Sequence, residues 1–444
     1  MKRQTINDLI RWKNAENRKP LLLLGARQIG KTWLLKEFGR TQYQNVVHID
    51  FERQEEYREF FATTKDPARI LQNLSIACGM PIQPGTTLVI FDEIQECPAA
   101  LTALKYFCED APEYHIAAAG SLLGITLAQT SYPVGKVNLI KMYPMNFLEF
   151  LDAIGDEALA GYLEELSAIE PIPAPLFNPL AEKLKLYLIT GGMPESVATW
   201  VDTRSTSEVQ RVLEELTMLY EFDFHKHAQT SQVPKIDLIW RSIPSQLARE
   251  NKKFLYSLVR TGARAREYED AVQWIVEANV LHKIPRSTGP DIPQAAYDEV
   301  SAFKLYLLDA GMLRRHAGLA PSAFSEGDRL FTEFKGALTE NYVLQELVSS
   351  HEGIPRYWAI DNPRYEVDFL VQHENEIVPI EVKAGENVRA RSLKKYRERY
   401  ADRTPIAVRL SMRNLSFDDG VLNIPLFLAG QTHRLIDVAM QMKK

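Results

Sequence analysis

The sequence has few cysteines and no long apolar run. It contains 3 cysteines in 444 residues, and Cys78, Cys97 and Cys108 form no C-x-x-C pair. This spacing argues against a disulfide framework or a thiolate zinc site, so we expect buried, inert thiols. Apolar runs such as Leu21–Leu24 are far too short to span a bilayer, and we therefore expect no membrane partner.

An excess of basic residues is also missing. The net charge is −6 and the sequence pI is about 5.9. The overall charge therefore does not indicate binding to nucleic acid or to an acidic membrane, although a local basic face is compatible with it. Residues 1–10 carry charges and no apolar core of signal-peptide length. We expect a cytoplasmic location.

Four apolar stretches alternate with helix-like segments near the start of the chain. They cover residues 21–24, 46–52, 87–93 and 114–121. Continuous apolar strands that alternate with helices predict a parallel sheet with both faces covered. The composition, 45% hydrophobic and 25% charged, is typical of a folded protein of this length with several domains.

The segment GARQIGKT at 25–32 matches the pattern G-x-x-x-x-G-K-[ST]. Its two glycines let the backbone curl so that N–H groups face an anion. Lys31 can reach the β- and γ-phosphates, Thr32 can bind Mg²⁺, and the following helix directs its positive end at the phosphates. We therefore predict an ATP site with Mg²⁺, formed by Gly25, Ala26, Arg27, Gln28, Ile29, Gly30, Lys31, Thr32 and Trp33.

A second part of this site follows in LVIFDEIQ at 88–95. Asp92, at the end of a predicted strand, would hold Mg²⁺ directly or through water. Glu93 would orient and polarise the attacking water and is predicted, with Lys31, to be catalytic. Ser121 ends the next strand and is included in the nucleotide site as a group that senses the γ-phosphate. A plain strand-end serine is the alternative.

Near the other end of the chain, YEVDFLVQHENEIVPIEVKAG at 365–385 predicts two strands joined by a polar turn. Side chains alternate along a strand, so Glu366 shares a face with Asp368, and Glu381 shares a face with Lys383. This arrangement is typical of a site that holds a metal ion. Glu340 lies on the apolar stripe of a predicted helix, which favours an inward-facing carboxylate.

Six segments resemble, in order, a large group of predicted bacterial and archaeal ATPases with an AAA+-like core close to the STAND class. They are GARQIGKT, VIFDEIQ, AAAGSLLG, YPMNFLEFL, ITGGMPESV and KLYLLDAGML. The resemblance covers nearly the whole chain and implies an α/β fold with four domains. These are a P-loop parallel-sheet ATPase core (1–150), a helical lid region (151–232), a winged-helix-like domain (233–320) and a restriction-endonuclease-like α/β domain (325–444).

The resemblance also implies a nuclease-like PD-(D/E)xK site in the last domain. It would give a second Mg²⁺ or Mn²⁺ the ligands Glu340, Asp368 and Glu381, while Lys383 would offset charge on the phosphate during catalysis. Val367 stands where the motif has proline. Two alternatives remain: a structural salt-bridge cluster on a fold that never cuts, or an unrelated hairpin. Glu366 is either a substitute ligand or a solvated strand residue.

Two further assignments come from the resemblance alone. In STAND-type ATPases a Gly-x-Pro segment contacts the adenine, and Gly192-Met193-Pro194 fits that pattern, which places Pro194 in the nucleotide site. A helix-breaking turn is the alternative reading. Arg314 and Arg315 are candidates for an arginine finger and could equally be surface charges.

Two basic stretches, 235–266 and 389–403, could contact DNA. The alternatives are packing on the ATPase core for the first and a solvated helix face for the second. The combined hypothesis is an ATP-hydrolysing switch that gates a nuclease-like domain acting on nucleic acid. The alternative is an ATP-dependent regulator whose inactive nuclease fold binds DNA or protein. ATP is the expected partner, and DNA and self-association into a homo-oligomer are left open.

Overall fold

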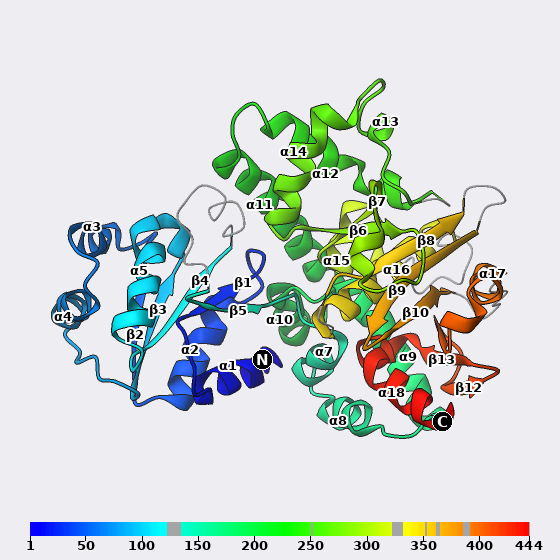
Figure 1. The fold of residues 1–444 in the computed structure, drawn as a ribbon, viewed down its shortest axis with the longest axis horizontal. Coiled ribbons are helices and arrows are strands. Elements are labelled where there is room, and N and C mark those ends of the chain that lie inside the picture. Colours follow the sequence, from blue (N-terminus) through cyan, green and yellow to red (C-terminus); the bar gives the residue numbers. More distant parts are fainter. Residues whose placement is uncertain are drawn as a thin grey trace. The chain divides into compact units, whose positions relative to one another are not determined.

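The computed structural model describes residues 1–121, 135–249, 252–321, 332–350, 353–360, 365–384 and 391–443. The chain forms two compact units, one of residues 2–143 with 277–280 and the other of 144–276 with 281–444. Figure 1 draws both, and each is described by itself. The three segments predicted after residue 150 all belong to the second unit, so the boundaries between them stay a prediction.

The first unit is built on a five-stranded sheet with the order β2-β3-β4-β1-β5, in which all neighbouring strands are parallel. The strands are β1 (Leu21–Leu24), β2 (Asn45–Asp50), β3 (Thr87–Asp92), β4 (His115–Gly120) and β5 (Asn138–Lys141). The four predicted strands and their parallel arrangement are therefore confirmed. Parallel strands align their carboxyl ends, so the segments after β1, β3 and β4 meet at one edge of the sheet.

Helices cover this sheet. They are α1 (Thr5–Asn14), α2 (Lys31–Gln42), α3 (Glu59–Thr63), α4 (Pro67–Cys78) and α5 (Pro98–Asp110), with 3₁₀ turns at Glu55–Arg58 and Ile94–Glu96. The start of α4 is set by Asp66, whose side chain accepts from the Ala68 N–H, and by Pro67 at the first helical position. Phe61, Ile70 and Phe91 belong to the buried core between α3, α4, α5 and the sheet.

The second unit begins with a mainly helical region, as expected. Its helices are α7 (Phe147–Ala153), α8 (Glu157–Glu165), α9 (Ala174–Thr190), α10 (Pro194–Thr203), α11 (Thr206–His227), α12 (Val233–Leu247), α13 (Tyr256–Val259), α14 (Ala265–Glu277), α15 (Ala310–His316), α16 (Thr332–Ser350), α17 (Arg391–Arg399) and α18 (Thr432–Lys443). Short 3₁₀ helices cover Gln294–Tyr297, Ala401–Arg403 and Leu426–Gln431.

A mixed eight-stranded sheet with the order β12-β13-β11-β10-β9-β8-β6-β7 completes the second unit. The strands are β6 (Leu281–Ser287), β7 (Asp298–Leu307), β8 (Arg356–Ile360), β9 (Tyr365–His373), β10 (Glu376–Val382), β11 (Ala407–Ser411), β12 (Ser416–Asp418) and β13 (Val421–Pro425). The predicted strand pair is confirmed, because β9 and β10 pair antiparallel. The β6–β7 hairpin joins the same sheet through β8, so the predicted middle and last domains share one sheet.

Three of the segments that carry the family resemblance meet inside this unit. The Asp309 carboxylate accepts hydrogen bonds from the N–H groups of Gly192 (2.6 Å) and Met312 (2.8 Å). A Cβ on Gly192 would lie 2.0 Å from the Met145 carbonyl oxygen, which also accepts from the Tyr187 hydroxyl at 2.5 Å. These segments therefore join α7, α9, α10 and α15, and the glycine is needed for the close approach.

Two further features are the apolar character of the helices and the burial of the cysteine thiols. Within the described ranges, no helix combines the length and apolar character that crossing a membrane requires. The three cysteines are free thiols. Cys97 is buried and burial raises the pKa of its thiol, whereas Cys78 and Cys108 are half-buried. The prediction of buried thiols therefore holds for Cys97 alone.

Candidate functional site

The loop between β1 and α2 has the curled backbone that its glycines predict. Three of its residues have positive φ: Gly25 (151°), Gln28 (61°) and Gly30 (91°). A Cβ on Gly25 would lie 2.4 Å from the Met142 carbonyl oxygen, so no larger residue fits there. Gly30 immediately precedes α2, which places the loop at the positive end of that helix.

Lys31 lies over this loop. Its Nζ donates hydrogen bonds to the carbonyl oxygens of Gly25 (2.9 Å) and Ala26 (2.6 Å). Both of these acceptors are uncharged, so a phosphate placed in the loop would offer the ammonium a stronger partner. Trp33, two residues further along, is 46% exposed on α2.

Thr32 and Asp92 are brought together although they lie far apart in the sequence. The Thr32 side chain hydrogen-bonds to the Asp92 carboxylate, which His48 Nε2 also contacts at 3.1 Å. Burial by itself would raise the pKa of Asp92, but the hydrogen bonds from His48 and Thr32 outweigh burial and lower it. Asp92 is therefore ionised, as a Mg²⁺ ligand must be. His48 was not predicted from the sequence.

Glu93 belongs to a second polar network at the same edge of the sheet. Its carboxylate accepts from Gln95 Nε2 at 2.5 Å and from the Ser121 hydroxyl at 3.4 Å. Arg27 Nε donates to the same Ser121 oxygen at 3.3 Å. The structure thus brings together four residues from three separate segments, of which Arg27, Glu93 and Ser121 were predicted. Their catalytic and sensing roles remain predictions.

Arg3 supports the loop and was missed by sequence reasoning. It is buried and donates from Nη1 to the Ile29 carbonyl at 2.8 Å and from Nη2 to the Tyr143 carbonyl at 2.5 Å. No local pattern links Arg3 to a loop more than twenty residues away, so only the fold reveals the contact. Its position suits a residue that fixes the loop backbone.

The residues assigned from the resemblance alone lie in the second unit. Pro194 is the first residue of α10, following Met193, and its place beside the adenine stays a prediction. Arg314 is fully buried and donates to the carbonyl oxygens of Ile189 and Leu319, while burial lowers its pKa to about 10. Arg315 pairs with Glu214 at 2.5 Å. Arg314 is thus not a surface charge.

The carboxylates predicted to bind a second metal are paired with lysines. Glu340 forms an ion pair with Lys252, and Glu381 forms one with Lys383. Lys304, whose side chain is fully buried in β7, pairs with Glu366 at 2.5 Å. Glu366 is thus half-buried, with 16% of its side chain exposed, and it has a cationic partner.

Asp368 has a different environment in the same cluster. Its Oδ2 accepts from the Val382 N–H at 2.7 Å. Burial and the neighbouring charges of Glu340 and Glu381 raise its pKa well above the usual range. For Glu340, by contrast, burial would raise the pKa, but Lys252 and Lys304 lower it. The cluster therefore balances its charge internally.

The second metal site and its ligands stay a prediction. No group of three or more acidic, histidine or cysteine side chains in the described part of the chain is placed to hold one. Glu381 Oε2 is buried without a hydrogen-bond partner among these residues, but Lys383 neutralises the same carboxylate. Sequence reasoning missed Lys304, although a lysine inside the apolar strand AFKLYLL was a signal of a buried partner.

Comparisons with known proteins agree with the geometry of the first unit. Residues 17–151 match the family described as AAA domain, residues 181–323 match a domain of unknown function (DUF8612), and residues 335–428 match another (DUF4143). Residues 17–151 are thus similar to AAA domains. A search of curated proteins gave no match.

Similar solved structures include the Walker-type ATPase PABY2304 of Pyrococcus abyssi, with 17% identity, a TM-score of 0.45, and coverage of 71% of this chain and 95% of that one. Orc1 of Aeropyrum pernix in complex with DNA has 13% identity, a TM-score of 0.28, and coverage of 71% and 90%. The RuvB Holliday junction branch migration motor of Thermotoga maritima has 14% identity, a TM-score of 0.31, and coverage of 64% and 90%.

Proposed function

We propose that this protein binds ATP with Mg²⁺ and hydrolyses it at the β1–α2 loop. The observation that supports this most directly is the convergence of Lys31, Thr32, Asp92 and Glu93 at one edge of the first sheet. The loop supplies curled backbone, the helix supplies its positive end, and Lys31 supplies a full charge. The three together favour a triphosphate over a smaller or less charged ligand.

Each residue then has a separate task. Lys31 exchanges its bonds to loop carbonyls for bonds to the β- and γ-phosphates. Thr32 and Asp92 would hold Mg²⁺, which neutralises phosphate charge when bound. Glu93, held by Gln95 and Ser121, accepts the proton of the attacking water. The Ser121 hydroxyl donates to Glu93, so a shift of Ser121 on binding or loss of the γ-phosphate would also shift the Glu93 carboxylate.

Release of phosphate from ATP tests this proposal. Wild type should release it in the presence of Mg²⁺, whereas Glu93→Gln should bind ATP in calorimetry and turn it over at least about a hundredfold more slowly. Glu96→Gln, a neighbouring acid outside the Glu93 network, is the matched control and should remain near wild type. Equal turnover by Glu93→Gln and wild type would remove Glu93 from the mechanism.

We further propose that the second unit responds to the ATPase cycle with a winged-helix-like part and a nuclease-like part that does not cut. The lysine partners of Glu340, Glu366 and Glu381 favour this alternative over an active nuclease, because a cation would compete with ammonium groups already in place. DNA or protein binding by this unit is the corresponding activity.

Incubation with plasmid DNA and Mg²⁺ or Mn²⁺ separates the two alternatives. We expect equal inertness of wild type and Asp368→Ala. Cutting by wild type and not by Asp368→Ala would show an active nuclease and overturn this part of the proposal. The ATPase assay is independent of the outcome, because Asp368 belongs to the other compact unit.

A further inference from the structure

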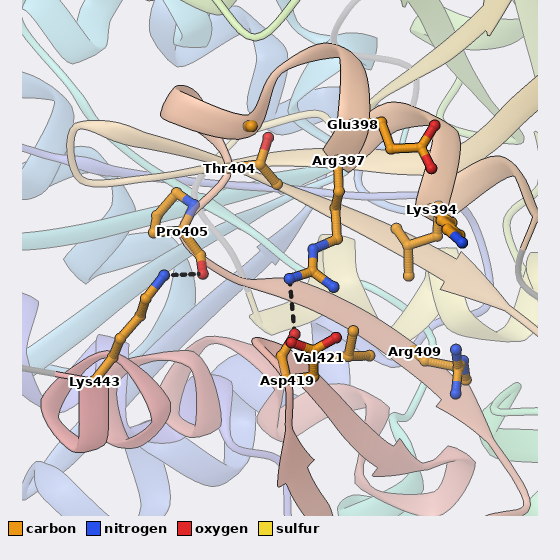
Figure 2. Close-up of a pocket in the computed structure, with 11 residues that line it drawn as sticks. Lys394, Arg397, Glu398, Thr404, Pro405, Arg409, Asp419, Val421 and Lys443 are labelled. Atoms are coloured by element: carbon orange, nitrogen blue, oxygen red, sulfur yellow. Dashed lines mark hydrogen bonds between the residues drawn. The ribbon is translucent and has the colours of Figure 1, made fainter.

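A cavity of about 680 Å³ lies between α17, β11, β13 and the end of α18. Figure 2 shows Lys394 and Arg397 extending from α17, Arg409 on its strand, and Lys443 on α18. Two acids, Glu398 and Asp419, also line the cavity. The lining therefore has more positive than negative side chains, in a protein whose net charge is −6.

The four cations are not neutralised by carboxylates. Arg397 donates to the backbone carbonyl of Asp419 at 2.7 Å, Arg409 to Asn423 Oδ1 at 3.2 Å, and Lys443 to the Pro405 carbonyl at 2.7 Å. Neither these three side chains nor Lys394 forms an ion pair with any carboxylate of the described chain. This differs from the lysines of the Glu340 cluster, each of which has its own acid.

Two donor groups in the cavity lack a hydrogen-bond partner. Thr404 is 5% exposed, and its hydroxyl is buried without a partner in the described part of the chain, as is the Nε of Arg409. Buried polar groups are nearly always hydrogen-bonded, so such groups in a folded protein need an explanation. Oxyanions are strong acceptors for hydroxyl and guanidinium donors of this kind.

The position of Arg397 is also fixed by its surroundings. Gly420 has φ of +69°, and a Cβ there would lie 2.8 Å from Arg397 Nη2. The glycine thus leaves the room that the guanidinium occupies beside the Asp419 carbonyl. A guanidinium held in one place can present its remaining N–H groups to a ligand at a small entropic cost.

The strand register connects this cavity with the carboxylate cluster. Arg409 lies opposite Glu381 of β10 on one side and opposite Asn423 of β13 on the other. Asn423 in turn donates to the hydroxyl of Ser416 on β12 at 3.1 Å. Residues opposite each other on neighbouring strands share a face, so a polar row crosses the sheet from Glu381 toward β12.

From these observations we propose that the cavity binds a phosphate group, with Arg397 and Arg409 as its main partners and Lys394, Lys443 and Thr404 at its sides. The phosphate belongs either to the backbone of a nucleic-acid strand or to a small phosphorylated molecule. The shared chemistry is a doubly or singly charged oxyanion that accepts several N–H and O–H bonds. The proposal does not depend on ATP hydrolysis.

The test uses the full chain without nucleotide and with EDTA, so that neither ATP hydrolysis nor cleavage contributes. One arm measures the anisotropy of a fluorescent single-stranded DNA oligonucleotide. The other measures the gain in melting temperature on adding inorganic phosphate against chloride at equal ionic strength. The variant is Arg397→Gln with Arg409→Gln. The matched control is Arg391→Gln with Arg399→Gln, which removes two exposed charges from α17 outside the cavity.

We expect the cavity variant to lose at least about tenfold in affinity for DNA, or to lose the stabilisation by phosphate, while the control changes less than about twofold. A loss in the DNA arm identifies a nucleic-acid backbone, and a loss in the phosphate arm alone identifies a small ligand. Lys394→Gln, at an exposed position that cannot disturb folding, should lower the salt dependence of DNA binding by about one counterion if DNA is the ligand.

Thr404→Val provides a readout that a structural role would not give. Valine removes the unpartnered hydroxyl, so the variant should be as stable as wild type or more stable without ligand. It should nevertheless gain less stability from phosphate or bind DNA more weakly. Equal behaviour of the cavity variant and its control in both arms would overturn the proposal.

Discussion

The charged side chains of the nucleotide loop and those of the carboxylate cluster of the second sheet have different kinds of partner. In the loop, Lys31 donates to uncharged carbonyl oxygens, and Asp92 is held by a histidine and a threonine. In the cluster, Glu340, Glu366 and Glu381 are paired with lysines, one of them drawn from a strand and one from the segment before α13. The first arrangement places Lys31 against neutral acceptors, whereas the second pairs three carboxylates with ammonium groups of the protein.

This difference shows how weakly a residue pattern alone decides activity. Both regions match a motif with the right residue types at the right spacing. The outcome depends on which partners the fold delivers, because a buried carboxylate binds either a metal ion or an ammonium group most strongly. The predictions below test whether the two regions differ as described.

The largest effect is expected at the nucleotide loop. Lys31→Ala removes the charge that we propose contacts the β- and γ-phosphates, and ATP hydrolysis should fall by at least about a thousandfold, which corresponds to about 4 kcal/mol. Phosphate release measures it. Lys36→Ala, an exposed lysine on the same helix, is the control and should behave as wild type. Normal ATP uptake by Lys31→Ala would show that the loop is not the nucleotide site.

In the carboxylate cluster, Lys304 should stabilise the folded protein. Lys304→Met leaves the half-buried Glu366 without its partner and should lower the free energy of unfolding by about 3 kcal/mol in urea denaturation. Lys395→Met, on the exposed face of α17, should change it by less than about 0.5 kcal/mol.

Removing both members of the pair sharpens this test. Lys304→Met with Glu366→Gln should recover most of the lost stability, since no uncompensated charge remains. A double variant no more stable than Lys304→Met would mean that the pair is not what stabilises the strand.

Glu346 is a buried carboxylate in a third kind of environment. It accepts a hydrogen bond from the Phe147 N–H at 2.8 Å and has no cationic partner in the described part of the chain. Burial raises its pKa to about 8. The unfolded chain loses this proton near pH 4.5, so wild type should lose stability between about pH 4.5 and 8. Glu346→Gln should remove up to about 5 kcal/mol of that loss.

Unfolding measured at pH 5 and pH 8 checks the effect of Glu346→Gln. The gain over wild type should be near zero at pH 5 and largest at pH 8. Glu374→Gln, at an exposed turn, should show no such dependence. An equal gain at both pH values would mean that Glu346 does not hold the proton.

The smallest expected change in stability concerns two aspartates, Asp92 and Asp368. The pKa of Asp92 is lowered and that of Asp368 is raised, so folding favours the ionised form of the first and the protonated form of the second. At pH 7, Asp92→Asn should lower the stability of the protein, and Asp368→Asn should raise it.

The pH dependence of the two aspartates should also differ in sign. The stability contributed by Asp92 is present above its unfolded pKa and disappears as the pH falls through the lowered folded value. The penalty at Asp368 grows as the pH rises above its unfolded pKa. Unfolding curves between pH 4 and 8 measure both. Two variants that shift stability in the same direction would contradict the comparison.

The sequence alone predicted four of the five strands of the first sheet, the curled loop and the β9–β10 pair. These features depend on neighbours in the chain: apolar runs, glycines at positive φ and a polar turn. It did not predict Arg3 beneath the loop or His48 beside Asp92, because no periodicity or motif connects residues on separate elements. The four domains stay a prediction, while the chain forms two compact units and one sheet joins the last two predicted segments.

The order of residues along the chain thus determined that a phosphate-binding loop follows β1 and that acids alternate along β9 and β10. The tertiary structure decided that Lys304 lies against Glu366 and Lys252 against Glu340, over separations of 62 and 88 residues. The physical reason is the distance along the chain over which each feature is determined. A turn or a helix start is set by a few successive residues, whereas the partner of a buried charge is set by how whole elements pack.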